Sequence, residues 1–344
     1  MKYILNLNIN PLVALLTTFF VCGKNSIYKR KDYAYRLVQS ALEHQSLEAM
    51  FKLTKYLSAD RVLDKVHRLS YERIQKLITK FNRKIKLPKK VTLAIDFTDK
   101  VYYGDKNHPE VMGSKGGKYA RRYIEVSTVR PALFINSLPV NQLTNDKKEL
   151  LAQLTDGFYA LYKKTKIELL LLDRGFFTKE VVKLLIDMQI KFIMPAIKNR
   201  AIKKLANQFA RGEIDNKICY QFGETKVKLL FLKVEDDILV YMTNTRYNVL
   251  RVAILYKKRW QIETNFREQN NFTFKTQTTN FTIRYLAFVI GGLLFNLWQL
   301  TRNKVPYNLE SYLFKYILVE EILKLWQEFS NMKIIKSIDY LLVA

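Results

Sequence analysis

The sequence predicts an α/β fold in which a mixed β-sheet carries helices on both faces, with a helical region before it and a β-rich insertion inside it. The first observation is the order of patterns between residues 91 and 197: three strands, a helix, a strand, a helix and a strand. The second is spacing, because short turns between the early strands favour antiparallel pairing, whereas helix crossovers add parallel strands. The third is length, since 344 residues suffice for one large domain with an insertion or for two domains.

The first 88 residues are rich in helix formers and are expected to form a helical N-terminal region. Within it, residues 58–86 contain two helical stretches, for which Ser58 and Ser70 are suitable N-caps. A helix-turn-helix-like DNA-binding unit fits this pattern, and a solvated basic face on a small helical bundle is the alternative. The basic residues of the second stretch are Arg73, Lys76, Lys80, Arg83 and Lys84.

Strand-like composition begins after residue 88. The expected strands are VTLAIDFT (91–98), YIEVSTV (123–129), ALFINSLPV (132–140), IELLLLD (167–173) and KFIMPAI (191–197). The fourth is apolar enough to be covered on both faces. A helix is expected from about residue 146 to 164, and another follows Thr178 as its N-cap.

Short alternating stretches after residue 197 indicate a β-rich insertion, and a helix over 249–272 and an apolar helix from about 283 follow it. Amphipathic helices are expected to the end of the chain. The predicted division is a helical N-terminal region (1–88), a first part of the core (89–197), the insertion (198–246), a second part of the core (247–305) and C-terminal helices (306–344).

The charge of the chain indicates a polyanionic partner. Lys and Arg number 58 against 31 Asp and Glu, a net charge of +27. This much like charge opposes compaction, and the basic residues are spread over several patches, as expected for a protein that follows a phosphate backbone. The pattern favours nucleic acid over a membrane surface, and a basic protein without such a partner is the alternative.

The remaining composition excludes several classes. Cys22 and Cys219 have neither zinc-ligand nor disulfide-framework spacing, so we expect an intracellular protein, cytoplasmic and associated with the nucleoid. The apolar stretch 12–22 is too short to cross a bilayer. The stretch 285–300 contains Asn296 and Gln299 and is expected to be a buried helix.

Two aspartates follow strongly apolar strands: Asp96 ends VTLAID and Asp173 ends LLLLD. Burying a carboxylate costs several kcal/mol unless a cation or hydrogen bonds compensate it. Ligands gather at the carboxyl ends of strands in open α/β sheets, so these two side chains are expected to face each other. Because like charges repel at that distance, a divalent cation between them is expected, and carboxylates suit Mg²⁺ or Mn²⁺.

The helix predicted over 249–272 offers a third carboxylate. Glu268 lies about 140° around a helix from Glu263. Leu255, Ile262 and Phe266 flank the helix face that carries Glu263 and would anchor the helix on the sheet. Glu263 lies among aromatic and cationic residues on this face, whereas Glu268 faces elsewhere, so we expect Glu263 to be the third acid. The residues that share an arc of roughly 100° with Glu263 are Tyr256, Arg259, Trp260, Arg267 and Asn270.

These residues resemble the DDE insertion-sequence transposases. Asp96 in LAIDFTD, Asp173 in LLLDRGFF and Tyr256-x2-Arg259-x3-Glu263 are most similar to the group with a tyrosine–arginine–glutamate–lysine signature, insertion-sequence family four, including its archaeal branch. The resemblance covers about 91–300 and implies an RNase H-like core. Asn270 stands where the signature has its lysine, and Arg267 and Lys275 are candidates to supply that cation.

The resemblance implies two-metal phosphoryl transfer. Asp96, Asp173 and Glu263 would hold two Mg²⁺ or Mn²⁺ ions for DNA cleavage and strand transfer, and a homodimer would pair two element ends with target DNA. Trp260 would stack on an unpaired base or serve in packing. The alternatives are an RNase H-like nuclease without strand transfer and a catalytically decayed relative that only binds DNA. The residues expected to contact DNA are Arg174, Tyr256, Lys257, Lys258, Arg259, Trp260, Arg267, Asn270 and Lys275.

Overall fold

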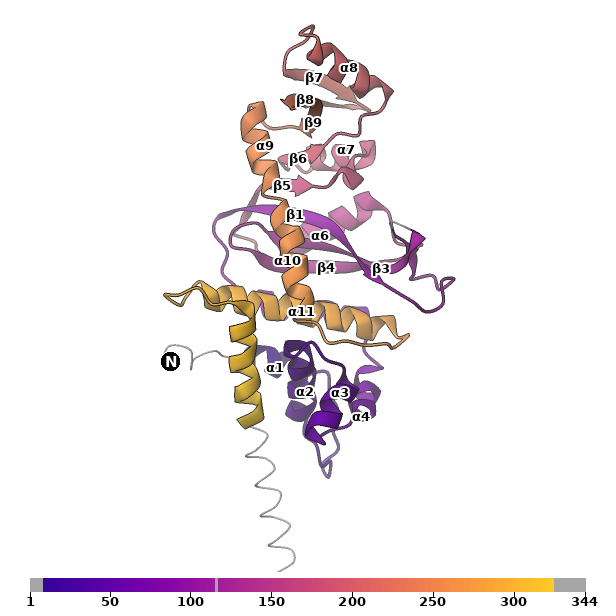
Figure 1. The fold of residues 1–344 in the computed structure, drawn as a ribbon, viewed down its shortest axis with the longest axis vertical. Helices are drawn as coiled ribbons and strands as arrows, with labels where there is room; N and C mark the ends of the chain where they lie inside the picture. Colours follow the sequence, from indigo (N-terminus) through magenta and orange to yellow (C-terminus); the bar gives the residue numbers. More distant parts are fainter. Residues whose placement is uncertain (1–8, 115–116, 325–344) are drawn as a thin grey trace, which may run out of the picture. The chain divides into compact units, whose positions relative to one another are not determined.

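The computed structural model describes residues 9–114 and 117–324, which belong to two compact units (Figure 1). The α/β unit is Asn82–Phe266, and the helical unit combines Met1–Phe81 with Arg267–Ala344. This division differs from the one expected from composition, which placed residues 267–305 with the core. The apolar pattern of 281–302 indicates a buried helix, but it does not indicate which elements bury it.

One mixed sheet forms the centre of the α/β unit. Its described strands have the order β2-β3-β1-β5-β6-β9-β8-β7, and β4 also pairs with β3. The strands are β1 (Lys90–Val101), β2 (Met112–Gly113), β3 (Tyr119–Thr128), β4 (Leu133–Val140), β5 (Lys166–Leu172), β6 (Phe192–Pro195), β7 (Lys217–Phe222), β8 (Thr225–Val234) and β9 (Asp237–Thr243).

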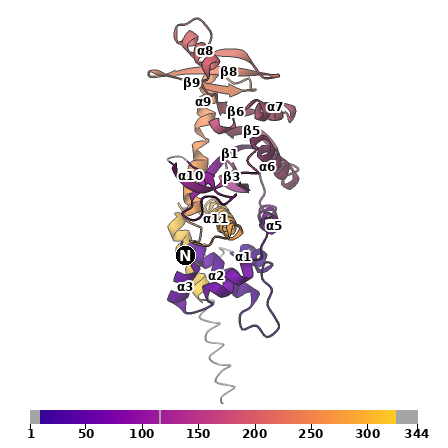
Figure 2. The same cartoon turned by 90° about the vertical axis from the view of Figure 1, so that its right-hand side faces the viewer.

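The expected mixed sheet is confirmed. β1, β3 and β4 pair antiparallel, whereas β5 runs parallel to β1 and β6 runs parallel to β5. The crossovers contain α6 (Lys147–Leu161) and α7 (Lys179–Asp187), which Figure 2 shows on the side of the sheet opposite α9 and α10. Thr178 caps α7 as predicted, since its hydroxyl accepts a hydrogen bond from the Val181 N–H.

The segment after β6 has the expected β-strands but begins with a helix that the sequence analysis missed, α8 (Arg200–Ala210). β7, β8 and β9 form an antiparallel meander, and β9 pairs antiparallel with β6, from Ile193 opposite Thr243 to Pro195 opposite Tyr241. The insertion therefore extends the central sheet. β6 has only four residues and gains its second hydrogen-bonded neighbour from the insertion.

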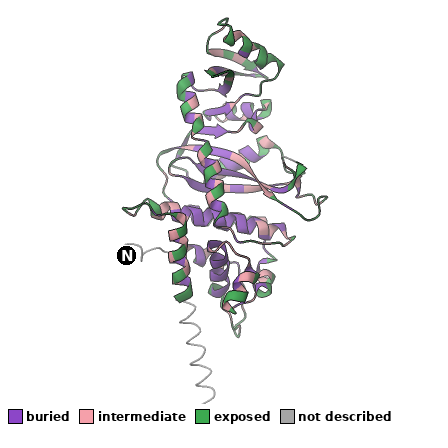
Figure 3. Cartoon of the chain, viewed as in Figure 1, coloured by how far each residue is buried: buried purple, intermediate pink, exposed green. Residues whose placement is uncertain are grey.

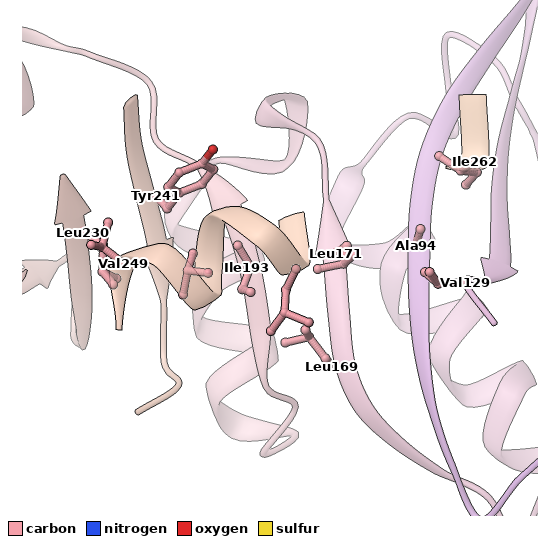
Figure 4. Close-up of a cluster of buried hydrophobic side chains, with 11 residues drawn as sticks. Ala94, Val129, Leu169, Leu171, Ile193, Leu230, Tyr241, Val249 and Ile262 are labelled. Carbon is pink, nitrogen blue, oxygen red and sulfur yellow. The ribbon is translucent and has the colours of Figure 1, made fainter. Parts of the chain in front are cut away.

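The prediction of one continuous helix over 249–272 is wrong, because the helix is interrupted. The structure contains α9 (Val249–Lys257) and α10 (Trp260–Asn270), separated by a turn at Lys258 and Arg259. Side chains from both helices pack on the strands in one apolar cluster (Figure 4). The cluster contains Ala94, Val129, Leu169, Leu171, Ile193, Leu230, Tyr241, Val249, Val252, Leu255 and Ile262, with Phe266 packed against it.

This packing makes the inner face of α9 important for stability. We expect Leu255→Ala to lower the free energy of unfolding by about 2–5 kcal/mol, because it removes buried methyl groups and leaves a cavity. Leu250→Ala on the same helix is the matched control, and it should change stability by about 0.5 kcal/mol or less. Leu255 is 9% exposed and Leu250 is 62% exposed. Equal losses in urea unfolding would contradict the placement of α9.

The helical unit contains α1 (Asn10–Thr17), α2 (Arg30–Leu42), α3 (Leu47–Thr54), α4 (Ala59–Val66), α5 (Tyr71–Asn82) and α11 (Phe281–Arg302), and residues 311–324 are also helical. The Arg73 N–H donates to the Ser70 hydroxyl at 3.4 Å, as a cap of α5 requires, whereas Ser58 precedes α4 without a capping bond. Residues 325–344 of the predicted C-terminal helices lie outside the described residues.

α11 is buried in the protein, as expected from Asn296 and Gln299, which argue against a membrane-spanning helix. Within the described part of the chain it is the one helix long and apolar enough to cross a membrane, but 83% of that apolar window is buried in the protein (Figure 3). At Gly291 a Cβ would lie 2.6 Å from Thr273 Cγ2 and 2.9 Å from the Gln269 carbonyl oxygen. Glycine is therefore required where α11 meets the segment after α10.

Candidate active site

The β1–β5 pairing brings Asp96 and Asp173 to the same edge of the sheet. Ile95 lies opposite Leu172 in the last parallel pair, so the two aspartates are the next residues on neighbouring strands. β1 continues past Asp96 to Val101, three residues beyond the predicted end of this strand at Thr98. It continues because β3 still pairs with it, whereas β5 stops at Leu172. Beyond Asp96, β1 has therefore lost its β5 neighbour.

The turn after β5 explains the sequence LLLLDRGFF. Asp173 caps a short 3-10 helix, η2 (Arg174–Phe176), and its carboxylate accepts a hydrogen bond from the Gly175 N–H at 3.4 Å. Phe176 stacks on Phe97 with ring centroids 5.0 Å apart, and Phe177 packs against Phe222 at 4.7 Å. The two buried phenylalanines fix the turn, so that Asp173 lies at the edge of the core.

Hydrogen bonds from Arg259 link Glu263 to Asp96 at this edge of the sheet. Its Nη1 donates to Asp96 Oδ2, its Nη2 donates to Glu263 Oε1 at 2.7 Å, and its Nε donates to the Tyr256 hydroxyl at 3.0 Å. The side chain of Arg259 is 7% exposed, against 13% for Asp96 and 38% for Glu263. One buried guanidinium thus lies between two of the three predicted acids.

Two cavities open at this point of the sheet. The larger, about 940 Å³, is lined by all three predicted acids together with Arg259. The smaller, about 790 Å³, is lined by Arg174, Tyr256 and Trp260. Asp173, Gly175 and Arg259 line both. The predicted acids therefore share one cavity, and four of the predicted DNA-contacting residues, including Arg259, line the cavity beside it.

Burial controls the electrostatics of the site. It raises the pKa of Asp96 to about 6 from the ordinary 3.8; Arg259 opposes this shift, and the charge of Asp173 adds to it. Burial also raises the pKa of the Tyr256 hydroxyl, which therefore stays protonated at neutral pH. The three carboxylates exceed the single charge of Arg259, so the site can accept further positive charge.

The raised pKa of Asp96 has a consequence for stability. Between about pH 4 and pH 6 the folded protein keeps a proton on Asp96 that the unfolded chain has lost, so the free energy of unfolding falls as pH rises through this window. Between about pH 4 and pH 6, the free energy of unfolding of the wild type should fall by up to about 3 kcal/mol more than that of Asp96→Asn.

Urea unfolding of both proteins at about pH 4 and about pH 7 measures this difference. Asp187→Asn, at the exposed C-terminal end of α7, is the control and should show no comparable change. A difference between wild type and Asp96→Asn that does not vary with pH would show that burial does not destabilise the Asp96 carboxylate.

The other predicted contact residues have separate locations. Lys257 is exposed and Lys258 is half-buried at the end of α9. Arg267, Asn270 and Lys275 belong to the helical unit. Lys275 is exposed, and its backbone N–H donates to the Gln45 carbonyl oxygen at 3.2 Å.

Sequence reasoning missed a second charged group in the larger cavity. Asp99 accepts hydrogen bonds from Arg122 Nε at 2.7 Å and Nη2 at 2.8 Å, and from the Ser114 hydroxyl at 2.7 Å. All three residues line the cavity. The available signal was the second aspartate in DFTD, three residues after Asp96.

The donor set fits a divalent cation. Within residues 9–114 and 117–324, no three Asp, Glu, His or Cys side chains are arranged to hold a single ion. Carboxylate oxygens are nevertheless the ligands that Mg²⁺ and Mn²⁺ prefer, and Asp96 and Glu263 already share a cationic group, the Arg259 guanidinium. Asp96, Asp173 and Glu263 present such oxygens along the larger cavity.

Fold and site together define an α/β enzyme with a carboxylate cluster at the carboxyl end of parallel strands, which suits metal-dependent phosphoryl transfer. Residues 87–288, more than half of the chain, match the family model described as the transposase DDE domain. The chain belongs to this family. It is a DDE transposase, a class of metal-dependent DNA nucleases and transferases.

The fold has a counterpart among solved structures. It is similar to a piggyBac transposase in a synaptic complex with hairpin DNA, with a TM-score of 0.62 and 14% sequence identity over 93% of this chain and 79% of that chain. At this identity the similarity concerns the fold alone. No curated protein is significantly similar to the sequence.

Proposed function

We propose that this transposase binds the ends of an insertion sequence and catalyses their cleavage and transfer to target DNA, with Asp96, Asp173 and Glu263 as the catalytic carboxylates. The observation that carries the proposal is their convergence on one cavity around the guanidinium of Arg259. In two-metal sites, bound divalent ions activate the attacking oxygen and stabilise the leaving oxygen of an in-line displacement at phosphorus.

The side chains around the acids suit a bound strand. Arg259 presents a planar guanidinium and Tyr256 a protonated hydroxyl, both suited to phosphate oxygens. Trp260 is 62% exposed at the smaller cavity, where its indole can stack on an unpaired base. Arg174 adds positive charge to the smaller cavity, and Lys257 and Lys258 directly precede Arg259 at the end of α9.

Membership of insertion-sequence family four is part of the proposal. The Tyr256, Arg259 and Glu263 side chains of the proposed signature are joined by hydrogen bonds, which supports a common role. Asn270 departs from the signature, and Arg267 or Lys275 would supply the missing cation. Pairing of two element ends requires two active sites, so we propose a homodimer on DNA in the cytoplasm.

The helical unit offers a second DNA contact. α4 and α5 are joined by a short turn, as in a helix-turn-helix-like unit. A cavity of about 390 Å³ in this unit is lined by Arg61, Lys65, Arg68 and Arg73. These cations suit phosphate contacts and support DNA binding by residues 1–88.

One reaction separates the proposal from its alternatives. Purified protein is incubated with labelled duplexes that carry the inverted repeats flanking its gene, with Mg²⁺ or Mn²⁺, and with EDTA as control. Strand-transfer products support the proposal. Cleavage without joining indicates an RNase H-like nuclease, and a metal-independent gel shift without cleavage indicates a decayed DNA-binding relative.

A further inference from the structure

Arg259 occupies the position of a cation in the acid cluster. Its three guanidinium nitrogens bond to Asp96, Glu263 and Tyr256, and its side chain is almost fully buried. The oxygens that it holds, Asp96 Oδ2 and Glu263 Oε1, belong to two of the three carboxylates proposed as metal ligands. A guanidinium bonded to them and a divalent cation between them would compete for the same negative charge.

The guanidinium of Arg259 lies beside two cavities that offer it different partners. It lines both the larger cavity, which contains the acids, and the smaller cavity, which contains Arg174 and Trp260. It also lies in the turn between α9 and α10, where the helix is interrupted. From this turn the guanidinium borders the carboxylates on one side and the smaller cavity on the other.

We propose that Arg259 is a placeholder cation: in the DNA-free protein it holds Asp96 and Glu263, and it releases them to a divalent metal ion when a DNA phosphate binds its guanidinium. The inference rests on the proposed function of the site. It makes DNA binding and metal binding mutually reinforcing, because each favours the arrangement in which Arg259 has left the acids. The carboxylates would then bind the metal ion mainly when the protein is bound to DNA.

Binding of Mn²⁺ tests the proposal without a measurement of activity. The full-length protein is titrated with Mn²⁺, and free Mn²⁺ is followed by electron paramagnetic resonance, with and without an element-end duplex. For the wild type, DNA should tighten Mn²⁺ binding by about tenfold or more, after subtraction of Mn²⁺ bound by the duplex alone. Arg259→Gln should bind Mn²⁺ about tenfold more tightly than the wild type in the absence of DNA, and DNA should add little.

Arg251→Gln is the matched control. It removes the same charge from an exposed residue of α9 that lines neither cavity. Its DNA-free affinity for Mn²⁺ should stay within about threefold of the wild type, since it changes only a screened, exposed charge. Arg259→Lys, which keeps the charge but cannot bridge two carboxylates, should fall between wild type and Arg259→Gln.

Arg259→Gln leaves Asp96 buried without its cation, so circular dichroism is recorded for each variant, and Arg259→Lys decides the test if Arg259→Gln does not fold. DNA-free Mn²⁺ affinity of the Arg259 variants no higher than that of the wild type would overturn the proposal. Equal effects of the Arg259 and Arg251 variants would also overturn it. Failure of the proposed function is distinguishable, because it would appear as absent DNA cleavage while the DNA-free titration still decides the role of Arg259.

Discussion

Asp173→Asn is expected to lower the rate of DNA cleavage by a factor of about one thousand or more, because it removes a charged metal ligand and with it several kcal/mol of transition-state stabilisation. The amide keeps the shape of the side chain and can still accept the hydrogen bond from the Gly175 N–H, so the turn after β5 should persist. DNA affinity should change by about twofold or less, because binding depends mainly on cations that remain.

The measurement is a single-turnover cleavage assay on a labelled element end, paired with fluorescence anisotropy for binding. Asp187→Asn, at the end of α7, is the matched control and should cleave at the wild-type rate. Retained cleavage by Asp173→Asn would remove Asp173 from the active site. Loss of both binding and cleavage would show a structural role instead.

DNA affinity is expected to fall by a factor of about 10³–10⁵ between about 50 and 200 mM salt, if six to ten phosphates are contacted. Each contact contributes about −0.9 to the slope of log affinity against log salt concentration on duplex DNA. The net charge of +27 and the spread of the basic residues are the reasons for expecting so many contacts. Anisotropy titrations at several KCl concentrations give the slope.

Asp173→Asn should give the same salt slope as the wild type, because it leaves every basic residue in place. A flat response would contradict the inference that the basic residues follow a DNA backbone, and affinity would then have to come from uncharged contacts. The slope also separates the number of contacts from the strength of binding, which a single affinity cannot do.

The order of the strands was predictable because the local patterns between residues 91 and 197 agree with the final pairing. Apolar length predicted β5, and short turns predicted the antiparallel β1–β3–β4 group. The proximity of Asp96 and Asp173 followed from the rule that ligand-binding residues gather at the carboxyl ends of strands, because β1 and β5 run parallel up to the Ile95–Leu172 pair. The shared side of Arg259 and Glu263 followed from their four-residue spacing, which their hydrogen bond confirms.

Features that depend on partners distant in sequence were not predictable. The predicted strand stopped at Thr98, whereas β1 continues to Val101 because β3 accompanies it that far. The break before Trp260 has no glycine or proline to mark it. By contrast, α8 has a clear helical spacing of Ile202, Ala206 and Phe209, and it was missed because the alternating stretches that follow it led us to assign residues 198–246 as β-rich.

The joining of β9 to β6 has a consequence for how such enzymes can be shortened. α9 rests partly on Leu230 and Tyr241, which come from the insertion, and α9 leads directly to Arg259 and Glu263. Deletion of residues 198–246 would expose the edge of β6 that pairs with β9. It would also remove the side chains on which α9 packs, and α9 leads into α10, which carries Glu263. Loss of the whole insertion is therefore expected to displace Glu263 from the other two acids.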